Sequence, residues 1–138
     1  MTPRHLDDVR IGDELPPIAY PITVYRLVME AGANRDFNSI HHNTQYAQST
    51  GAQEMYANTG FLLGMWERTV RDWIGTAGKI HAIKGFRMRS FNYAGDTTTV
   101  SGRVTAIDGD QITIEVVSRN STGVTVGPGT VTVSLPSR

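Results

Sequence analysis

Three polar side chains that could carry out proton chemistry lie within six residues, at Asp36, Asn38 and His41. An aspartate and a histidine held about one water molecule apart can take a proton from that water and return one to another atom of a substrate. The amide of Asn38 can hold a carbonyl group or the His41 ring in place without titrating. The same residue types also crowd ordinary turns, so a purely structural loop is the alternative interpretation of this segment.

The residues on both sides resemble the hydratase motif of the MaoC-like (R)-specific enoyl-CoA hydratases and dehydratases. That motif reads Asp-x-Asn-Pro-aliphatic-His, with Ala or Ser after five further residues. The positions of this chain that fall in register are Asp36, Asn38, Ile40, His41 and Ala47. The resemblance implies that Asp36 and His41 form the catalytic pair and that Asn38 orients the loop or the histidine ring.

Two positions in this stretch depart from the family pattern. Ser39 stands where the family has Pro, which removes a fixed φ and leaves the loop somewhat softer. Arg35 stands where the family has Gly, and it places a cation beside Asp36. A cation favours the ionised carboxylate if the two side chains approach each other.

The length and composition of the chain predict one compact domain, residues 1–138, because 138 residues with 39% hydrophobic content can bury a substantial core. Thirteen basic and thirteen acidic residues cancel, which gives no long-range attraction to nucleic acid or to an anionic membrane. The absence of cysteine excludes disulfides and thiolate chemistry. The N-terminal segment lacks the apolar core of a signal peptide, and no run approaches the roughly 20 apolar residues of a membrane span. We therefore expect a soluble cytoplasmic protein.

The periodicity of the chain changes from helical to strand-like after its middle. Prolines make residues 11–21 extended, Thr23 is the expected N-cap of a short helix to about Ala31, and residues 45–49 predict a helical turn. Residues 58–73 predict the longest helix, with apolar side chains at three- and four-residue spacing. The expected strands are His81–Tyr93, Thr97–Ile107, Gln111–Arg119 and Val124–Leu135. This order predicts an α+β fold in which a curved antiparallel β-sheet wraps around a long central helix.

The element order resembles the hotdog fold of the MaoC family over roughly residues 11–136. The turn Tyr93-Ala94-Gly95-Asp96 resembles the one that the family carries before its third long strand. Thr59-Gly60 falls where the family has His-Gly at the start of the long helix, and the resemblance implies that the Gly60 N–H is the oxyanion donor. The first N–H groups of a helix lack intrahelical partners and lie at its positive end, which suits this role. Close packing of the helix against the sheet is the alternative for Gly60 and the prediction for Gly64.

Four residues are predicted to bind the substrate, namely Thr59, Phe61, Arg87 and Arg89. Arg87 and Arg89 share a face of an expected strand and could meet phosphate groups, although a solvated strand face is the alternative. Phe61 belongs to an apolar set that either lines an acyl tunnel or forms the core face of the helix, the set being Phe61, Leu62, Met65 and Trp66.

The resemblance implies reversible hydration of a trans-2-enoyl-CoA thioester to the (3R)-3-hydroxyacyl-CoA, in fatty acid or steroid metabolism, with no cofactor. A 3-hydroxyacyl-ACP dehydratase and a non-catalytic acyl-thioester-binding subunit of a heteromeric hydratase stay open as alternatives, because no Gly-rich phosphate loop marks the carrier. The expected assembly is a homodimer or a heteromer with a second hotdog chain. No metal site is expected, because the adjacent His41 and His42 side chains point in different directions.

Overall fold

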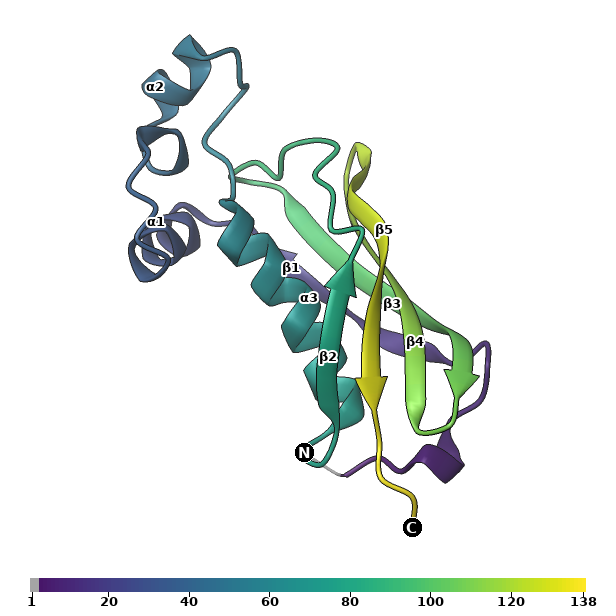
Figure 1. Ribbon diagram of the computed structural model, residues 1–138. Coiled ribbons are helices and arrows are strands. Elements are labelled where there is room, and N and C mark those ends of the chain that lie inside the picture. Colours follow the sequence, from purple (N-terminus) through teal and green to yellow (C-terminus); the bar gives the residue numbers. More distant parts are fainter. Residues whose placement is uncertain (1–2) are drawn as a thin grey trace.

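The computed structural model describes residues 3–138, which form an antiparallel sheet, a long helix and a group of short helices at one end of the sheet (Figure 1). The helical elements are η1 (Leu6–Asp8), α1 (Val24–Ala33), η2 (Ser39–His41), α2 (Thr44–Ser49) and α3 (Thr59–Ile74), where η marks a 3-10 helix. The strands are β1 (Glu14–Pro21), β2 (Lys79–Lys84), β3 (Thr97–Asp108), β4 (Gln111–Asn120) and β5 (Gly123–Ser134).

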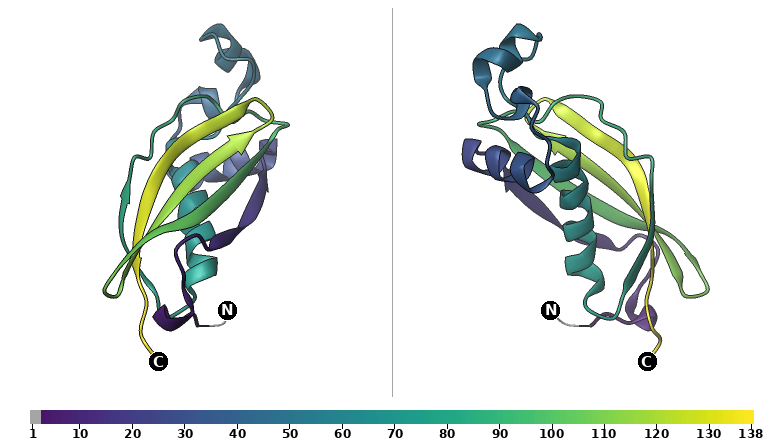
Figure 2. Two further views of the ribbon diagram at one scale, coloured as in Figure 1. Left: turned by 90° about the vertical axis from the view of Figure 1, so that its right-hand side faces the viewer. Right: turned by 60° about the vertical axis from the view of Figure 1, so that its left-hand side comes forward.

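The five-stranded sheet has the order β1-β3-β4-β5-β2, and each neighbouring pair is antiparallel. Tight turns join β3 to β4 and β4 to β5, whereas β1 and β2 come from either side of α3 in the chain and form the two edges. The sheet curves around α3, as the two views of Figure 2 show. This confirms the predicted α+β hotdog arrangement.

The core lies between α3 and the inner face of the sheet, because both carry apolar stripes. Trp66 and Val70 of α3 are fully buried, as are Ile114 and Val116, which alternate along β4. These spacings follow the period of about 3.6 residues in a helix and two in a strand. The indole N–H of Trp66 donates to Ser118 Oγ at 2.8 Å, so the one polar atom of this large buried side chain is satisfied and α3 is tied to β4.

The predicted helix starts are confirmed by their caps. Thr23 Oγ1 accepts a hydrogen bond from Arg26 N at 3.1 Å at the start of α1. Asn58 Oδ1 accepts one from Phe61 N at 2.8 Å at the start of α3, and Gly75 ends that helix with φ 75°. These side-chain acceptors satisfy N–H groups that have no partner within the first turn of a helix.

The predicted strand His81–Tyr93 is wrong in extent, because β2 covers only Lys79–Lys84. Gly85 ends the strand by turning the chain at φ 69°. A Cβ at Gly85 would lie 3.1 Å from the Cα of Gly129, so the two backbones approach too closely for a side chain to continue the ladder.

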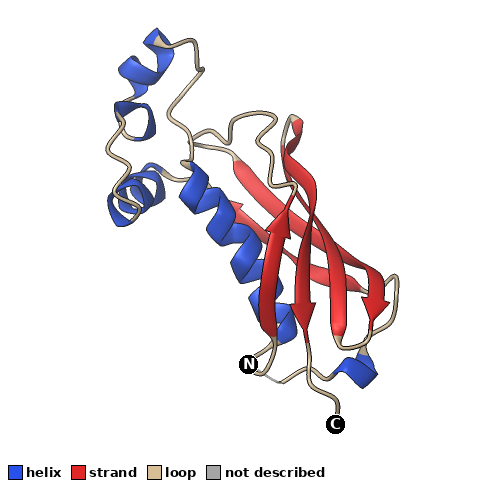
Figure 3. Cartoon of the chain, viewed as in Figure 1, coloured by secondary structure: helices blue, strands red, loops and turns tan. Residues whose placement is uncertain are grey.

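The chain after Gly85 is a loop that passes the N-terminal end of α3 on its way to β3. It pairs with the sheet at an isolated bridge between Met88 and Val126, and the side chain of Asn92 accepts hydrogen bonds from Thr98 on β3 and Thr125 on β5. The carbonyl of Asn92 then accepts a hydrogen bond from Ala57 N at 2.9 Å, just before α3 begins. This loop and the segment from α1 to α2 therefore meet at the N-terminal end of α3, and Figure 3 shows both at the same end of the molecule.

Candidate active site

Asp36 and His41 are in direct contact, with His41 Nε2 3.1 Å from Asp36 Oδ2. The sequence predicts them about one water apart, so the two side chains lie closer than expected. Asn38 holds the turn between them: its Oδ1 accepts from Ile40 N at 3.1 Å, and its carbonyl accepts from His41 N at 3.2 Å. The described hydrogen bonds of the Asn38 side chain are to the loop backbone and not to the histidine ring.

The carbonyl of Tyr56 determines which nitrogen of His41 carries a hydrogen. His41 Nδ1 lies 2.8 Å from Tyr56 O, and a carbonyl oxygen can only accept, so Nδ1 must donate. In a neutral ring Nε2 is then the acceptor, and it faces the Asp36 carboxyl group. The two atoms are 3.1 Å apart, so a proton carried by Nε2 or by Asp36 would lie between the two groups.

The two members of the pair differ in exposure. The His41 side chain is 7% exposed, whereas that of Asp36 is 40% exposed. His41 therefore lies behind Asp36, and the carboxyl group is the side of the pair that solvent or a ligand reaches first.

Tyr56 supports the pair and is absent from the predicted site. Its N–H donates to Ile40 O at 3.4 Å while its carbonyl accepts from His41, so both backbone groups hold the turn. Its ring meets His41 edge-on, with centroids 5.5 Å apart, and stacks on Phe91 at 4.0 Å. Burial, and next the neighbouring Tyr93, raises the pKa of the Tyr56 hydroxyl. The sequence carries only a weak signal for this role of Tyr56, because a residue of any type supplies a backbone carbonyl.

Arg35 adopts a left-handed conformation, with φ 54°. It is the one non-glycine residue among 3–138 with a positive φ, and it stands where the family motif has Gly. Glycine reaches this region without steric cost, whereas a side chain there costs about 1 kcal/mol or more. No ion pair joins Arg35 to Asp36 among the described residues, so the condition named above, an approach of the two side chains, is not met.

The start of α3 presents free N–H groups. Asn58 satisfies Phe61 N with its side chain and Leu62 N with its carbonyl, at 2.8 and 3.2 Å. Thr59 and Gly60 precede these positions, and their N–H groups have no acceptor among the described hydrogen bonds. The predicted oxyanion donor Gly60 is therefore available, at the positive end of the helix dipole.

Gly60 is packed against the segment that carries Asp36. A Cβ at Gly60 would overlap the side-chain amide of Asn34, two residues before Asp36. The Asn34 side chain is held in place by a hydrogen bond in which its Nδ2 donates to the carbonyl of Glu30 at 2.9 Å. Gly60 thus makes its close contact with the segment that carries Asp36, so any packing role of this glycine is toward that segment and not toward the sheet.

The remaining predicted binding residues lie in different surroundings. Arg87 and Arg89 are both exposed, and Arg89 Nε donates to Gly127 O, so part of the Arg89 guanidinium is occupied by the chain itself. Both belong to the loop after β2 and not to a strand, so the predicted shared strand face is wrong. Thr59 is exposed, and its hydroxyl lies 4.0 Å from Met88 Sδ of that same loop.

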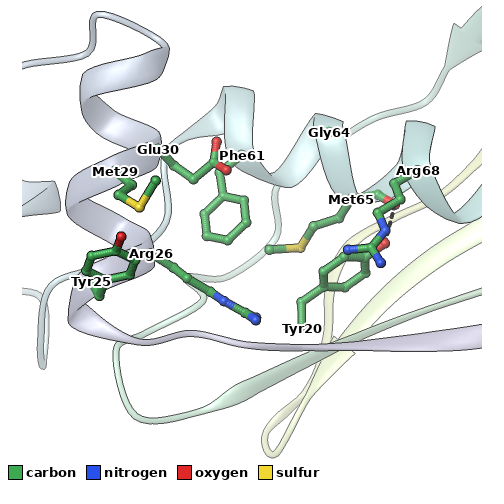
Figure 4. A pocket seen from close by; sticks show the side chains of 9 residues that line it. All are labelled: Tyr20, Tyr25, Arg26, Met29, Glu30, Phe61, Gly64, Met65 and Arg68. Atoms are coloured by element: carbon green, nitrogen blue, oxygen red, sulfur yellow. Dashed lines mark hydrogen bonds between the residues drawn. The ribbon is translucent and has the colours of Figure 1, made fainter.

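A cavity of about 430 Å³ lies between α1, β1 and α3 (Figure 4). Its lining residues are Tyr20, Tyr25, Arg26, Met29, Glu30, Phe61, Gly64, Met65 and Arg68. It begins at Phe61, the residue after Gly60, and follows α3 away from the helix start. A volume of several hundred Å³ with mostly apolar walls is typical of a small-molecule site.

The cavity divides the apolar residues of α3 into two groups. All four belong to the buried core, and two of them, Phe61 and Met65, also line the cavity, whereas Leu62 and Trp66 do not. The packing role predicted for Gly64 is wrong, because no atom lies within 4 Å of the position that its Cβ would take. Gly64 faces the cavity, and its missing side chain leaves that space open.

The histidines outside the pair make local contacts. His42 Nε2 lies 3.3 Å from Phe37 O, and His81 Nε2 lies 2.7 Å from Ser134 Oγ. Within residues 3–138, no three His, Cys, Asp or Glu side chains gather into a group that could hold a metal ion. The same part of the chain contains no helix that is both long and apolar enough to cross a membrane.

Comparison with known proteins agrees with this site and fold. No family model matches the sequence. A curated relative, the 3-oxo-4,17-pregnadiene-20-carboxyl-CoA hydratase beta subunit of Mycobacterium tuberculosis, is 39% identical over 128 residues, which are 93% of this chain and 96% of the relative.

Two solved structures extend the comparison. The ChsH1–ChsH2 complex from Mycobacterium tuberculosis contains a chain with 36% identity and a TM-score of 0.87, over 91% of this chain and 98% of that one. A MaoC-like dehydratase has 24% identity and a TM-score of 0.89, over 97% of this chain and 42% of the other, and at that identity it supports the fold alone.

The fold and the site define a hotdog protein with an aspartate–histidine pair beside the start of its central helix. The identity to the hydratase beta subunit then shows the family. This chain belongs to the MaoC-like hydratases and dehydratases, and it is a hydro-lyase.

Proposed function

We propose that this chain hydrates a trans-2-enoyl-CoA thioester to the (3R)-3-hydroxyacyl-CoA, and that it dehydrates the product in the reverse direction. The observation that carries the proposal is the direct contact of Asp36 with His41, in which the carbonyl of Tyr56 fixes the tautomer of the ring. Such a pair shares one proton, which is what a reaction that both removes and delivers a proton requires. The (3R) configuration is taken from the family resemblance.

The proton balance of the reaction fits a single shared proton. The oxygen of water bonds to C3 and the proton that it loses passes to the pair, while the proton already on the pair passes to C2. The C=C π bond and one O–H bond break, and one C–O and one C–H bond form, so the pair ends with the proton count it began with. Because the titrations of two contacting groups are coupled, both transfers are assigned to the pair as a unit.

Besides the two proton transfers, the reaction requires stabilisation of the negative charge on the thioester oxygen, and Gly60 is proposed to supply it. Attack at C3 moves electrons to the thioester oxygen, which becomes enolate-like before C2 is protonated. The unpaired N–H of Gly60, at the start of α3, is our proposed donor to that oxygen. Asn34 places Gly60 and Asp36 in one packed unit, because it touches the glycine and lies in the same segment as the acid. The chain's own groups therefore supply every proton transfer and the charge stabilisation.

The acyl group of the thioester is proposed to lie in the cavity between α1 and α3. The cavity starts at Phe61, next to the proposed oxyanion donor, and its volume of about 430 Å³ suits an acyl group much larger than crotonyl. The curated relative is named for a bulky CoA ester, which agrees with a roomy site.

We also propose that a second hotdog chain completes the assembly. Strand β2 pairs only with β5 within the described chain, so its other side is an open sheet edge. Large apolar side chains also remain exposed along α1, namely Val24, Tyr25, Val28 and Met29. Exposed apolar surface of this kind favours a protein interface. The structure of the ChsH1–ChsH2 complex shows that a similar chain assembles with a different one.

The test is the loss of enoyl absorbance when purified protein meets crotonyl-CoA and a bulkier trans-2-enoyl-CoA. Asp36→Asn and His41→Ala are measured in parallel, with circular dichroism and gel filtration to establish folding. Abolished turnover in both folded variants supports the proposal. Turnover that survives both substitutions contradicts it.

The same assay separates the alternatives. Faster reaction with the corresponding acyl-carrier-protein thioester, in the direction of water loss, favours the dehydratase. Absence of turnover by the isolated chain, with recovery when a co-purified partner is added, favours a heteromeric hydratase. If the Asp36→Asn variant of this chain is then as active as the wild type within the complex, the chain is a binding subunit and the partner carries the chemistry.

A further inference from the structure

The short segment around Tyr56, just before α3, touches both halves of the proposed site. The carbonyl of Tyr56 accepts a hydrogen bond from His41 Nδ1 at 2.8 Å, so it holds the ring of the aspartate–histidine pair. Ala57 comes directly before Asn58, the N-cap of α3, and three residues before Gly60, the proposed oxyanion donor. The placement of this one segment therefore sets where the pair lies relative to the start of α3.

Two backbone hydrogen bonds pair this segment with residues 92–94, in the loop between β2 and β3 at the N-terminal end of α3 (Figure 1). They are Ala57 N to Asn92 O and Ala94 N to Met55 O, each at 2.9 Å. Tyr56 lies opposite Tyr93, between the two bonds. In an antiparallel ladder, a residue in that place directs its own N–H and C=O away from the partner strand. Both backbone groups of Tyr56 therefore point toward the turn that carries His41, in agreement with their two hydrogen bonds to that turn.

The side chain of Asn92 fixes this two-bond ladder to the sheet through one oxygen. Asn92 Oδ1 accepts hydrogen bonds from Thr98 Oγ1 of β3 at 2.6 Å and from Thr125 Oγ1 of β5 at 3.0 Å. All three side chains are buried, and β3 and β5 lie on either side of β4. Because hydrogen bonds are directional, two of them to one oxygen give the ladder one preferred position relative to the sheet.

The fold uses the acceptor of this amide and not its donor. Asn92 Nδ2 is buried and has no hydrogen-bond partner among the described residues. An unpaired buried donor lowers stability, whereas an apolar network of the same shape avoids that loss. The side chain thus gives the ladder a direction at a cost in stability, and local costs of this kind are expected at functional sites.

We propose that Asn92 is a positioning residue of the active site. It holds the ladder in the place at which the Tyr56 carbonyl meets His41 and the N–H of Gly60 faces the substrate oxygen. Asn92 is 1% exposed, so it does not touch the substrate itself and acts through Tyr56 and the start of α3. This inference rests on the proposed function, because it takes the pair and Gly60 as the catalytic groups.

The first measurement follows the hydrogen bond between His41 and Tyr56 directly. Purified protein, with any chain that co-purifies, carries isotope-labelled histidine, and the proton on His41 Nδ1 is observed by NMR and assigned with His41→Ala. Asn92→Leu keeps the branching of the side chain and removes the acceptor oxygen, whereas Thr98→Val removes one donor and leaves Asn92 in place. Thr69→Val is the matched control, because its buried hydroxyl also makes two hydrogen bonds but lies in the second half of α3.

The second measurement is the turnover of crotonyl-CoA by the same variants. We expect Asn92→Leu to lower kcat by about tenfold to a hundredfold, the effect of a small misplacement of catalytic groups. Its KM should stay close to that of the wild type, because only the chemical step is impaired. The Nδ1 proton of His41 should exchange with water about tenfold faster in this variant. Thr98→Val should change both readouts in the same direction by less, and Thr69→Val should change neither.

A triple variant separates positioning from stability. Asn92→Leu, Thr98→Val and Thr125→Val together replace the network with apolar groups, so no hydroxyl is left unpaired and the urea midpoint should recover much of the loss seen in Asn92→Leu. Apolar contacts are not directional, so kcat should stay low. If kcat recovers together with the midpoint, or if Thr69→Val lowers kcat as much as Asn92→Leu does, Asn92 acts on stability alone and the proposal is overturned.

The two proposals fail in different ways. If the wild type turns over no thioester, the proposed hydration fails, and the exchange of the Nδ1 proton still decides whether Asn92 positions His41. If crotonyl-CoA is hydrated and folded Asn92→Leu matches the wild type in kcat and in proton exchange, the hydration stands and the role of Asn92 is overturned. If Asn92→Leu does not fold, the same comparison with Thr98→Val decides.

Discussion

The side-chain amide of Asn34 lies against Gly60, in the space that a Cβ at Gly60 would occupy. This contact joins the loop of the acid–base pair to the start of α3. We expect Gly60→Ala to displace Asn34 and with it Asp36, two residues further along the chain. The value of kcat for crotonyl-CoA should then fall by at least tenfold. The free energy of unfolding should fall by about 1–3 kcal/mol, as for other overpacked sites, measured by urea denaturation.

The double variant Asn34→Ala with Gly60→Ala is the control for steric overlap. Removing the amide makes room for the new methyl group, so the double variant should be more stable than Gly60→Ala alone. If the stability loss of the double variant equals the sum of the losses in the two single variants, the two residues do not interact, which contradicts the contact.

His41 makes two contacts with separable roles, a hydrogen bond from Nδ1 to Tyr56 O and the approach of Nε2 to Asp36, and two substitutions distinguish them. His41→Asn can keep a donor near the Nδ1 position and so retain the bond to Tyr56 O, whereas His41→Ala loses both contacts. We expect both variants to lose about 10²–10⁴-fold in kcat. His41→Ala should also lose about 1–3 kcal/mol of stability, because it leaves the Tyr56 carbonyl without its donor. Equal unfolding midpoints for the two variants would argue against a supporting role of Tyr56.

Arg35 carries conformational cost at a position where a glycine would carry none. With φ 54°, a change of Arg35→Gly should relieve about 1 kcal/mol of backbone strain, partly offset by the greater flexibility of glycine when unfolded. The expected result is a higher urea midpoint than wild type, and Arg35→Ala, which keeps the strain, is the matched control. If the urea midpoint falls in Arg35→Gly and not in Arg35→Ala, the backbone at residue 35 is not strained.

The local part of the site was predictable from the sequence. Asp36, Asn38 and His41 are close in the chain, so a short turn is enough to bring them together. Their spacing within a known motif predicts that Asp36 and His41 form a pair, although one water apart and not in the direct contact that the structure shows. The start of α3 was also predictable, because its cap at Asn58 and its apolar period are local signals. The side-chain types identify the chemistry without knowledge of the whole fold.

The non-local part was not predictable. Tyr56 reaches His41 across 15 residues through a backbone carbonyl, which every residue possesses, so its type carries no signal. Strand β2 was predicted too long because the apolar alternation continues past Gly85, and only the close approach of Gly129 ends the ladder. Gly64 was assigned to packing because a helical glycine often marks a close contact, whereas here it borders a cavity that only the placement of α1 creates.

Asp96 links the turn before β3 to the rest of the sheet. Its environment leads us to expect that part of the protein's stability is lost at acid pH. The hydrogen bond from Ser121 Oγ, and next the one from Thr97 N, lowers the pKa of this carboxyl group from its ordinary value of 3.8, although partial burial opposes the shift. A carboxyl group whose pKa is lower in the folded state stabilises the fold above the unfolded value. That contribution is lost as the pH falls through 3.8 toward the lower folded value.

We therefore expect Asp96→Asn to be less stable than wild type at pH 7, and the difference to shrink below about pH 4. Urea midpoints at several pH values between 7 and 3 measure it, with Asp108→Asn at the end of β3 as the control. A difference that stays constant over this range would show that the charge of Asp96 contributes nothing.

Gly64 provides the last prediction, because stability and substrate range should respond to it in opposite directions. Alanine at this position meets no atom within 4 Å, so Gly64→Ala should stabilise α3 by about 1 kcal/mol through the helix propensity of alanine. Gly64→Leu should fill part of the cavity and lower kcat/KM for a polycyclic 2-enoyl-CoA far more than for crotonyl-CoA. Equal losses for the two thioesters, at unchanged stability, would place the acyl group outside the cavity between α1 and α3.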